Sequence, residues 1–168
     1  MFRVGSSARL LIVGQAPGRR VHESGIPWND ASGDVLRGWL GMTREEFYDP
    51  SRIAIVPVGL CYPGTVEGAD LPPSPRCAPL WQPRFRAALP RISLTLLVGS
   101  YAQAHYLDER RKATLTETVR AFRDCLPEFF PLPHPSWRNL AWVRRNPWFA
   151  EDVIPALRRR VKAALRSV

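Results

Sequence analysis

Four short apolar runs are spread along the chain, and each has the length of a buried strand. Polar residues do not alternate with the apolar ones inside these runs, which is typical of strands in a parallel sheet covered on both faces. The first and third runs end in glycine. We therefore expect strands over residues 8–14, 52–58, 94–99 and 129–132.

Amphipathic segments separate the apolar runs. In residues 32–40 the apolar side chains recur at the spacing of one helix face, with Ser32 as a possible N-cap and Gly41 suited to end the helix. Further helical segments are expected as a turn at 43–47, a helix over 80–89 distorted near Pro83, and helices over 101–107, 115–125, 138–145 and 148–165.

This alternation of strands and helices predicts an α/β fold. We expect a three-layer α/β/α sandwich around a central, four-stranded, mostly parallel sheet, built as a single domain over residues 1–168. In such sheets the ligand lies beyond the carboxyl ends of the strands. Two loops of unusual composition, 14–33 and 133–139, follow the first and last strands and meet at this edge.

Composition and charge narrow the classes of protein. No apolar run approaches the length of a membrane span, and the N-terminus lacks the pattern of a signal peptide, so we expect a cytoplasmic monomer with no membrane partner. The chain has 24 Lys and Arg residues against 15 Asp and Glu, and only two of the basic residues are lysines. Guanidinium groups match phosphates well, which favours a nucleic acid as a partner over a merely Arg-rich surface.

The first loop is rich in glycine and proline. Four glycines and two prolines between residues 14 and 33 allow the backbone to approach a ligand with its N–H groups exposed. The loop fits neither the Walker pattern nor the dinucleotide-binding GxGxxG pattern. On this pattern alone, a plain tight turn remains an equal alternative.

The second loop holds a histidine between two prolines, Pro133 and Pro135. This setting makes the side chain of His134 stiff, and a neutral imidazole can donate a hydrogen bond near neutral pH. We therefore favour a functional role for His134 over a place in the core.

Together the two loops resemble a known family. The sequence Gly-Gln-Ala-Pro-Gly at 14–18 and His-Pro-Ser at 134–136 are similar to the two signature motifs of the uracil-DNA glycosylase superfamily. Residues 14–33 resemble the thermophile-type iron–sulfur branch most closely, and the resemblance covers nearly the whole chain. It implies a monofunctional DNA glycosylase of base-excision repair, which hydrolyses the N-glycosidic bond of a flipped uracil or other deaminated base.

The resemblance also implies roles for individual residues. Trp28 would stack on the flipped base, if it is not simply a core tryptophan, and His134 would stabilise the charge that grows on the departing base. The other implied base-binding residues are Gln15, Ala16, Pro17, Gly18 and Asn29. DNA contacts are implied for Ser136, Trp137, Arg138, Arg19 and Arg20, with Trp137 or Leu140 as a wedge in the gap that the base leaves.

The residue that positions the attacking water differs from the family pattern. The iron–sulfur branch has an acidic residue where this chain has Val21, and other branches have Asp where it has Ala16. Of the nearest carboxylates we favour Glu23 and then Asp30, although Glu23 can equally be a surface charge paired with an arginine. Two further polar candidates nearby are Asn29 and His22.

Base recognition and the metal cluster differ as well. The branch reads uracil with an Asn after its second strand, whereas residues 56–60 contain no side-chain amide, so another base or a contact from Asn29 is an alternative. Cys61 and Cys77 match two of the four thiolates that a [4Fe–4S] cluster needs, while Cys125 fits a buried thiol. We expect no cofactor or metal unless a cysteine pair precedes residue 1.

Two other functions stay open at this point. A catalytically weak or inactive DNA-binding member of the same superfamily would share the fold and charge, and the changes at Val21 and 56–60 are of the kind that would produce it. A nucleotide- or phosphate-binding α/β protein would use the loop at 14–18 but leaves the motif at 134–136 unexplained.

Overall fold

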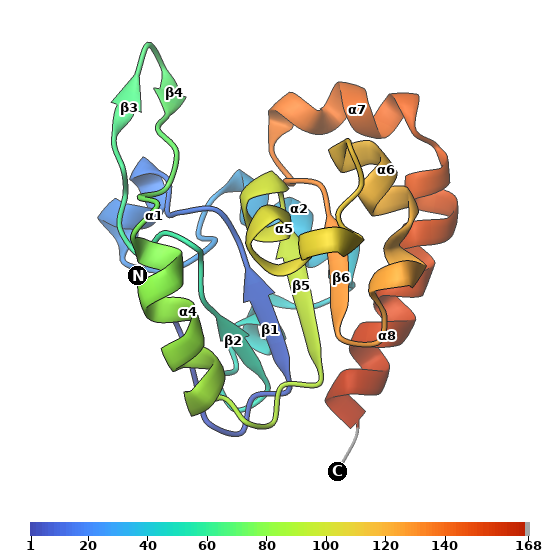
Figure 1. Cartoon of the computed structure of the whole chain (residues 1–168), viewed down its shortest axis with the longest axis horizontal. Coiled ribbons are helices and arrows are strands. Elements are labelled where there is room, and N and C mark those ends of the chain that lie inside the picture. Colours follow the sequence, from blue (N-terminus) through green and yellow to red (C-terminus); the bar gives the residue numbers. More distant parts are fainter. Residues whose placement is uncertain (167–168) are drawn as a thin grey trace.

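A computed structural model describes residues 1–166 and places the strands in one parallel sheet. The strands are β1 (Leu10–Val13), β2 (Ile53–Ile55), β5 (Leu94–Val98) and β6 (Phe129–Leu132), in the order β2-β1-β5-β6 (Figure 1). Residue Ile12 of β1 lies opposite Ile55 on one side and Leu96 on the other. The expected α/β fold with a four-stranded sheet is confirmed, and every pair of neighbouring strands is parallel.

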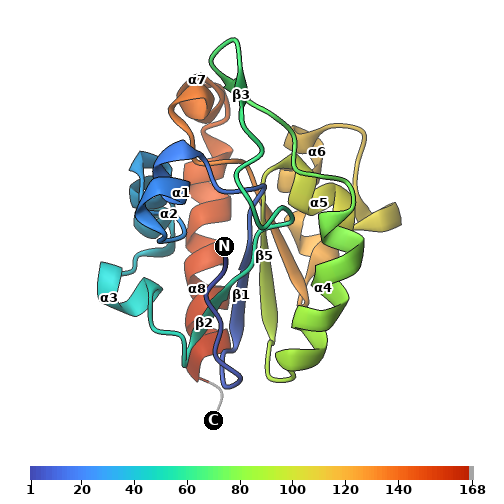
Figure 2. The same ribbon diagram turned by 90° about the vertical axis from the view of Figure 1, so that its left-hand side faces the viewer.

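Helices cover both faces of the sheet (Figure 2). Helices α2 and α8 pack on one face, and α4 and α5 pack on the other. The helices run as α1 (Arg19–Ser24), α2 (Ala31–Leu40), α3 (Arg44–Phe47), α4 (Cys77–Ala88), α5 (Ser100–Tyr106), α6 (Leu115–Arg120), α7 (Leu140–Arg145) and α8 (Ile154–Arg166). Shorter turns are η1 (Asp108–Arg110), η2 (Phe122–Cys125), η3 (Trp137–Asn139) and the π-helical η4 (Phe149–Val153).

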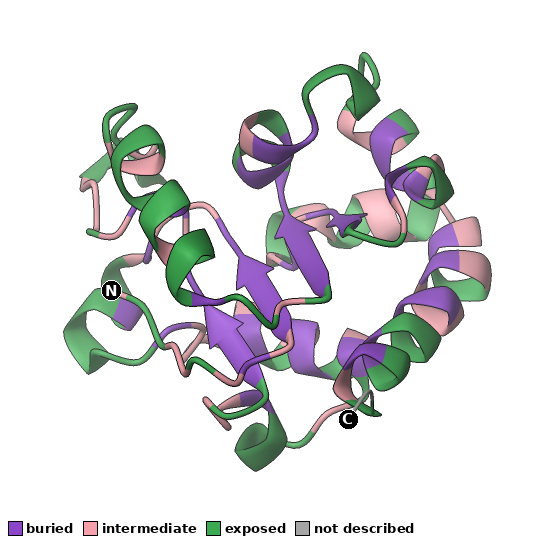
Figure 3. Ribbon diagram, turned by 60° about the horizontal axis from the view of Figure 1, so that its bottom comes forward, coloured by how far each residue is buried: buried purple, intermediate pink, exposed green. Residues whose placement is uncertain are grey.

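The core forms two layers because neighbouring residues of a strand face opposite sides of the sheet. Ile12 and Leu96 belong to the layer beneath α2 and α8, whereas Leu11 and Leu97 belong to the layer beneath α4 and α5. All residues of β1, β2, β5 and β6 are buried, while the outer faces of the helices are exposed (Figure 3). This double cover explains why the strands are continuous apolar runs.

Several element boundaries differ from the sequence prediction. The predicted loop over 14–33 contains helix α1, and the N-cap of α2 is Asp30 rather than Ser32, since the Asp30 carboxylate accepts from the Gly33 N–H at 2.9 Å. The strand predicted over 52–58 ends at Ile55, where the chain turns to bond the loop after β1. Local patterns specify the existence of an element better than its ends.

The helices of the second half differ in the same way. Helix α4 begins at Cys77 and continues through Pro83, which lies beyond its middle. The helix predicted over 115–125 divides into α6 and η2, because the chain tightens to a 3₁₀ turn after Arg120. Before α8 the chain forms the π-helical turn η4, where a helix starting at 148 was expected.

A small hairpin in the proline-rich segment was not expected. Strands β3 (Thr65–Val66) and β4 (Ala69–Asp70) pair antiparallel around Glu67 and Gly68, which both have positive φ. The hairpin projects beyond the carboxyl edge of the main sheet, on the same side as α7 (Figures 1 and 2). Within residues 1–166, no helix is both long and apolar enough to cross a membrane.

Candidate active site

The loop after β1 crosses the carboxyl edge of the sheet and is fixed by its neighbour. The Val58 N–H donates to the Gly14 carbonyl at 3.0 Å, and the Gly59 N–H donates to the Gln15 carbonyl at 2.8 Å. In the described part of the chain, the N–H groups of Gln15, Ala16 and Gly18 have no acceptor. The loop therefore presents several backbone donors that are free to bind a ligand.

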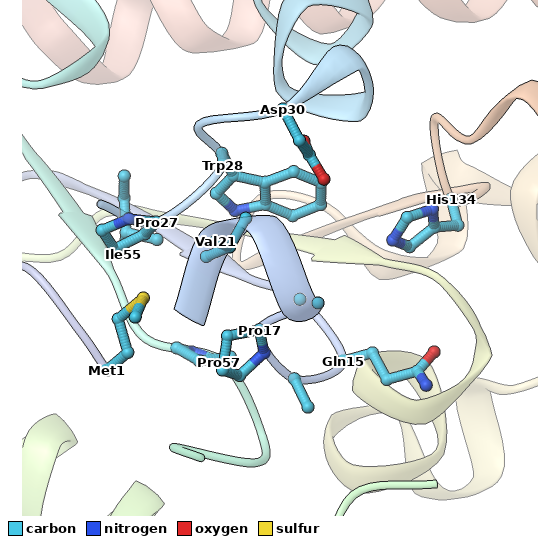
Figure 4. Close-up of a pocket in the computed structure, with 13 residues that line it drawn as sticks. Met1, Gln15, Pro17, Val21, Pro27, Trp28, Asp30, Ile55, Pro57 and His134 are labelled. Atoms are coloured by element: carbon cyan, nitrogen blue, oxygen red, sulfur yellow. The ribbon is translucent and has the colours of Figure 1, made fainter. Parts of the chain in front are cut away.

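Residues 14–18 border a small pocket (Figure 4). Its volume is about 90 Å³, several times the roughly 10–15 Å³ that one water needs by this measure. Most of the lining is apolar, and the polar side chains in it belong to Gln15, Asp30 and His134. The lining residues are Met1, Gly14, Gln15, Ala16, Pro17, Gly18, Val21, Pro27, Trp28, Asp30, Ile55, Pro57 and His134.

Trp28 supplies the aromatic wall of the pocket in an unusual backbone conformation. Its φ of 59° lies in the left-handed region, which costs a bulky residue roughly 1–3 kcal/mol. The Tyr48 hydroxyl donates to the Pro27 carbonyl at 2.7 Å, and the Arg37 guanidinium donates to the Trp28 carbonyl at 3.3 Å. The strained peptide is thus held from behind the pocket.

Two glycines make room for Trp28. A Cβ on Gly14 would lie 2.8 Å from the Trp28 indole, so the ring can rest against the loop only because this position is glycine. A Cβ on Gly33 would lie 1.8 Å from the Trp28 carbonyl oxygen, which no rearrangement of a side chain can relieve. The motif glycines 14 and 33 therefore serve the placement of the tryptophan.

His134 follows β6 and faces Trp28 across the pocket, with 5.6 Å between the ring centroids and 32° between the planes. The Asn139 amide donates to the His134 carbonyl at 2.7 Å, and the buried Gln103 amide donates to the Leu132 carbonyl at 2.9 Å. Burial lowers the pKa of His134 below its ordinary value, and the negative charges of Asp30 and Asp70 partly oppose this effect. The imidazole is therefore neutral near pH 7 and keeps one N–H to donate.

Asp30 combines a structural and a chemical position. One carboxylate oxygen caps helix α2 through the Gly33 N–H, and the side chain points toward the space between Trp28 and His134 (Figure 4). Among the described residues, no side chain or backbone group donates to its second oxygen. That oxygen is available to accept from a water molecule in the pocket.

Other candidates lie outside the pocket lining. Glu23 is exposed on α1 and accepts from the Arg19 guanidinium at 2.9 Å. The Asn29 amide oxygen accepts from Arg44 at 2.8 Å. The His22 ring lies beside the ring of Tyr62. The structure thus brings Asp30, but not Glu23 or Asn29, to Trp28 and His134.

Residues expected to touch DNA lie on the segments that follow β1 and β6, at the carboxyl edge of the sheet. Trp137 in η3 is 76% exposed, and Leu140 at the start of α7 is 52% exposed. The Arg138 guanidinium donates to the Gly68 carbonyl at 3.2 Å, which ties η3 to the β3–β4 hairpin. Ser136 is half-buried, while two exposed arginines on α1 lie at the same edge: Arg19 and Arg20.

The cysteines do not fit a cluster by themselves. Cys61 is exposed, Cys77 begins α4 and Cys125 is buried in η2. Within residues 1–166, no group of three or more His, Cys, Asp or Glu side chains is placed to hold a metal ion. An iron–sulfur cluster held by cysteine alone needs four thiolates, and this sequence has three.

Sequence reasoning missed the residues behind Trp28. Arg37 lies on a predicted amphipathic helix and Tyr48 follows a predicted turn, and neither position stands out in a single sequence. Val21, noted only for lacking a carboxylate, is buried and lines the pocket. A tryptophan between two glycines at 25 and 33 was the one local signal of tight backbone packing.

Comparisons with known proteins agree with this fold. The solution NMR structure of a protein from Methanosarcina acetivorans, described as a candidate uracil DNA glycosylase, matches the fold with a TM-score of 0.50 and 16% sequence identity. The match covers 94% of this chain and 93% of that one. The family model of the uracil DNA glycosylase superfamily matches residues 2–158. This chain therefore belongs to the uracil DNA glycosylase superfamily.

Proposed function

We propose that this protein is a DNA glycosylase that removes a flipped, deaminated base by hydrolysis. The observation that carries the proposal is the meeting of Trp28, His134 and Asp30 at one small pocket, in a chain of this superfamily. The three side chains supply a stacking surface, a neutral hydrogen-bond donor and a free carboxylate oxygen. A glycosylase needs these groups to hold a base, stabilise it as it departs and position water.

The free backbone donors support a deaminated base as the substrate. Deamination replaces an amino group of the base by a carbonyl oxygen, which accepts hydrogen bonds instead of donating them. Such an oxygen can accept from the free N–H groups of Gln15, Ala16 and Gly18. The amino group of an undamaged cytosine or adenine is itself a donor, so these N–H groups would find no acceptor there. Uracil, hypoxanthine and xanthine all carry this oxygen, so these donors favour uracil over cytosine and hypoxanthine over adenine.

The chemistry follows from the placement of the side chains. As the bond between the sugar and the base breaks, the bonding electron pair leaves with the base, and the neutral His134 donates a hydrogen bond to the negative charge. Water held by the free oxygen of Asp30 attacks the sugar carbon and loses its proton toward the carboxylate. Asp30 then releases this proton to solvent and the base anion takes up one proton from solvent, so that the net products are free base and an abasic site.

The pocket mouth suits a duplex from which one base has been extruded. The formal net charge of +9 favours a polyanionic partner. The exposed Arg19 and Arg20 directly follow the pocket residue Gly18, and the exposed Arg138 lies four residues after His134. The exposed Trp137 would fill the gap in the base stack, a role that apolar wedges have in other DNA-binding proteins. Binding of DNA is therefore part of the proposal.

A glycosylase assay tests this function. Purified protein is incubated with labelled oligonucleotides that carry uracil, hypoxanthine or xanthine, opposite each base and single-stranded, and abasic sites are then cleaved with alkali. We expect cleavage at one or more of these bases, and a loss of about 100-fold in rate for His134→Ala. DNA binding without cleavage at any base would instead support an inactive member of the superfamily.

A further inference from the structure

The direction of the Trp28 ring depends on a backbone conformation that tryptophan does not adopt readily. With a φ of 59°, the peptide turns the indole over Gly14 and toward His134. A return to the ordinary extended region would swing the side chain away from the pocket. A strained residue of this kind persists only where its surroundings hold it, so the contacts of the peptide matter to the site.

Two side chains hold that peptide from the side away from the pocket. The Tyr48 hydroxyl, just after α3, donates to the Pro27 carbonyl at 2.7 Å. The Arg37 guanidinium, on α2, donates to the Trp28 carbonyl at 3.3 Å and reaches the Tyr48 hydroxyl at 3.5 Å. Two successive carbonyl groups are thus fixed by a connected pair of donors, and neither donor lines the pocket.

Arg37 is itself held rigidly. Its side chain is only 7% exposed, and it forms an ion pair with Asp34 at 2.5 Å. The guanidinium also lies over the rings of Phe47 and Tyr48, at 5.3 and 5.7 Å from their centroids. A cation is costly to bury, and stacking on two rings together with an ion pair compensates for this. Such a group transmits the position of α2 and α3 to the Trp28 peptide.

We propose that Arg37 and Tyr48 are positioning residues that keep Trp28 in its left-handed conformation, so that the stacking surface for the base exists before DNA binds. The part of this inference that concerns the base rests on the proposed function. The part that concerns the ring does not, because the relation of Trp28 to His134 can be measured in the free protein.

The matched test removes one hydroxyl from each of two tyrosines, the half-buried Tyr48 and the buried Tyr106. Tyr48→Phe deletes the donor to Pro27 but keeps the ring beneath Arg37. Tyr106→Phe deletes a hydroxyl that donates to Gln82 at 2.6 Å on the opposite face of the sheet. Each variant loses one hydrogen bond from a tyrosine hydroxyl to a protein acceptor, so a general loss of stability affects both. Only Tyr48→Phe removes a contact of the Trp28 segment.

The imidazole of His134 reports on the ring in the absence of DNA. The chain has three histidines, so the His134 resonances can be assigned by comparison with His134→Gln. The indole at 5.6 Å shifts these resonances through its ring current, and Trp28→Ala gives the size of that shift. We expect Tyr48→Phe to move the resonances toward their position in Trp28→Ala, and Tyr106→Phe to leave them in place. Unchanged resonances in Tyr48→Phe would overturn the inference.

Excision kinetics provide the second readout. Stacking binds the flipped base equally before and during bond cleavage, so loss of the support should raise the half-saturating DNA concentration about fivefold with little change in the maximal single-turnover rate. An unchanged half-saturating concentration, or a change confined to the maximal rate, would contradict this. If Tyr48→Phe does not fold, Arg37→Lys takes its place. If the wild-type protein excises no base, the proposed function fails while the resonance test still decides the inference.

Discussion

The rings of Trp28 and His134 lie 5.6 Å apart between their centroids, although one follows the first strand of the sheet and the other follows the last. A planar base placed between two rings needs about 3.5 Å on each side, or roughly 7 Å in all. The gap is too narrow for this arrangement. The base must therefore stack on Trp28 alone and meet His134 at its edge, which is the geometry of a hydrogen-bond donor and not of a second stacking partner.

The burial of His134 has a consequence for stability. Because burial lowers its pKa below the ordinary value of about 6.5, the unfolded chain binds more protons at this residue than the folded chain as the pH falls below that value. The free energy of unfolding is therefore expected to fall on acidification from pH 7.5 to 5.5, and to fall less in His134→Gln. Urea unfolding at the two pH values measures the difference.

The same histidine can be titrated by NMR in the folded and the urea-unfolded protein. The midpoint in the folded protein should lie below that in the unfolded protein. Burial also lowers the pKa of His105. His105 is present in both the wild type and His134→Gln, so its contribution to the pH dependence of the unfolding free energy is the same in both proteins. An equal or higher midpoint for His134 in the folded state would contradict its assignment as a neutral donor at pH 7.

Asp30 and Glu23 can be separated by two isosteric changes. Asp30→Asn should lower the excision rate about 100-fold or more, because the amide accepts poorly from the attacking water and cannot take its proton. The new side chain still has an oxygen to cap α2, so the melting temperature should change little. Glu23→Gln should alter the rate less than twofold, since Glu23 is exposed and only pairs with Arg19. A larger effect of Glu23→Gln than of Asp30→Asn would reverse the assignment.

The sequence predicted which loops form the site better than it predicted which carboxylate lies in the pocket. Buried runs and motif spacing placed Trp28 and His134 at one edge of one sheet, because parallel strands bring the loops that follow them together. The choice between Glu23 and Asp30 was beyond local pattern. It depends on a six-residue helix, α1, that carries Glu23 outward, and on a cap that turns Asp30 inward. Tertiary contacts decide both features.

Substitution by alanine is expected to have opposite effects on stability at the two glycines of α2. A Cβ on Gly33 would clash with the Trp28 carbonyl, so Gly33→Ala should destabilise the protein by ~1–3 kcal/mol and impair excision. A Cβ on Gly38 meets nothing within 4 Å, so Gly38→Ala should stabilise the helix by ~0.5–1 kcal/mol and leave excision unchanged. Thermal or urea unfolding of both variants measures the contrast. Equal effects of the two would show that Gly33 does not support Trp28.

The position of the DNA can be tested by the salt dependence of binding. Log affinity falls linearly with log salt, and an arginine that neutralises one phosphate adds about one to the magnitude of this negative slope. Removal of the arginine reduces the magnitude by the same amount. Arg20 is exposed on α1 near the pocket mouth, whereas Arg91 is exposed at the opposite edge of the sheet, just before β5. We expect Arg20→Ala to reduce the slope by about one and Arg91→Ala to leave it unchanged. Titrations of a fluorescent duplex at several salt concentrations give both slopes. A reduced slope for Arg91→Ala alone would place the DNA at the wrong end of the strands for a base to reach Trp28.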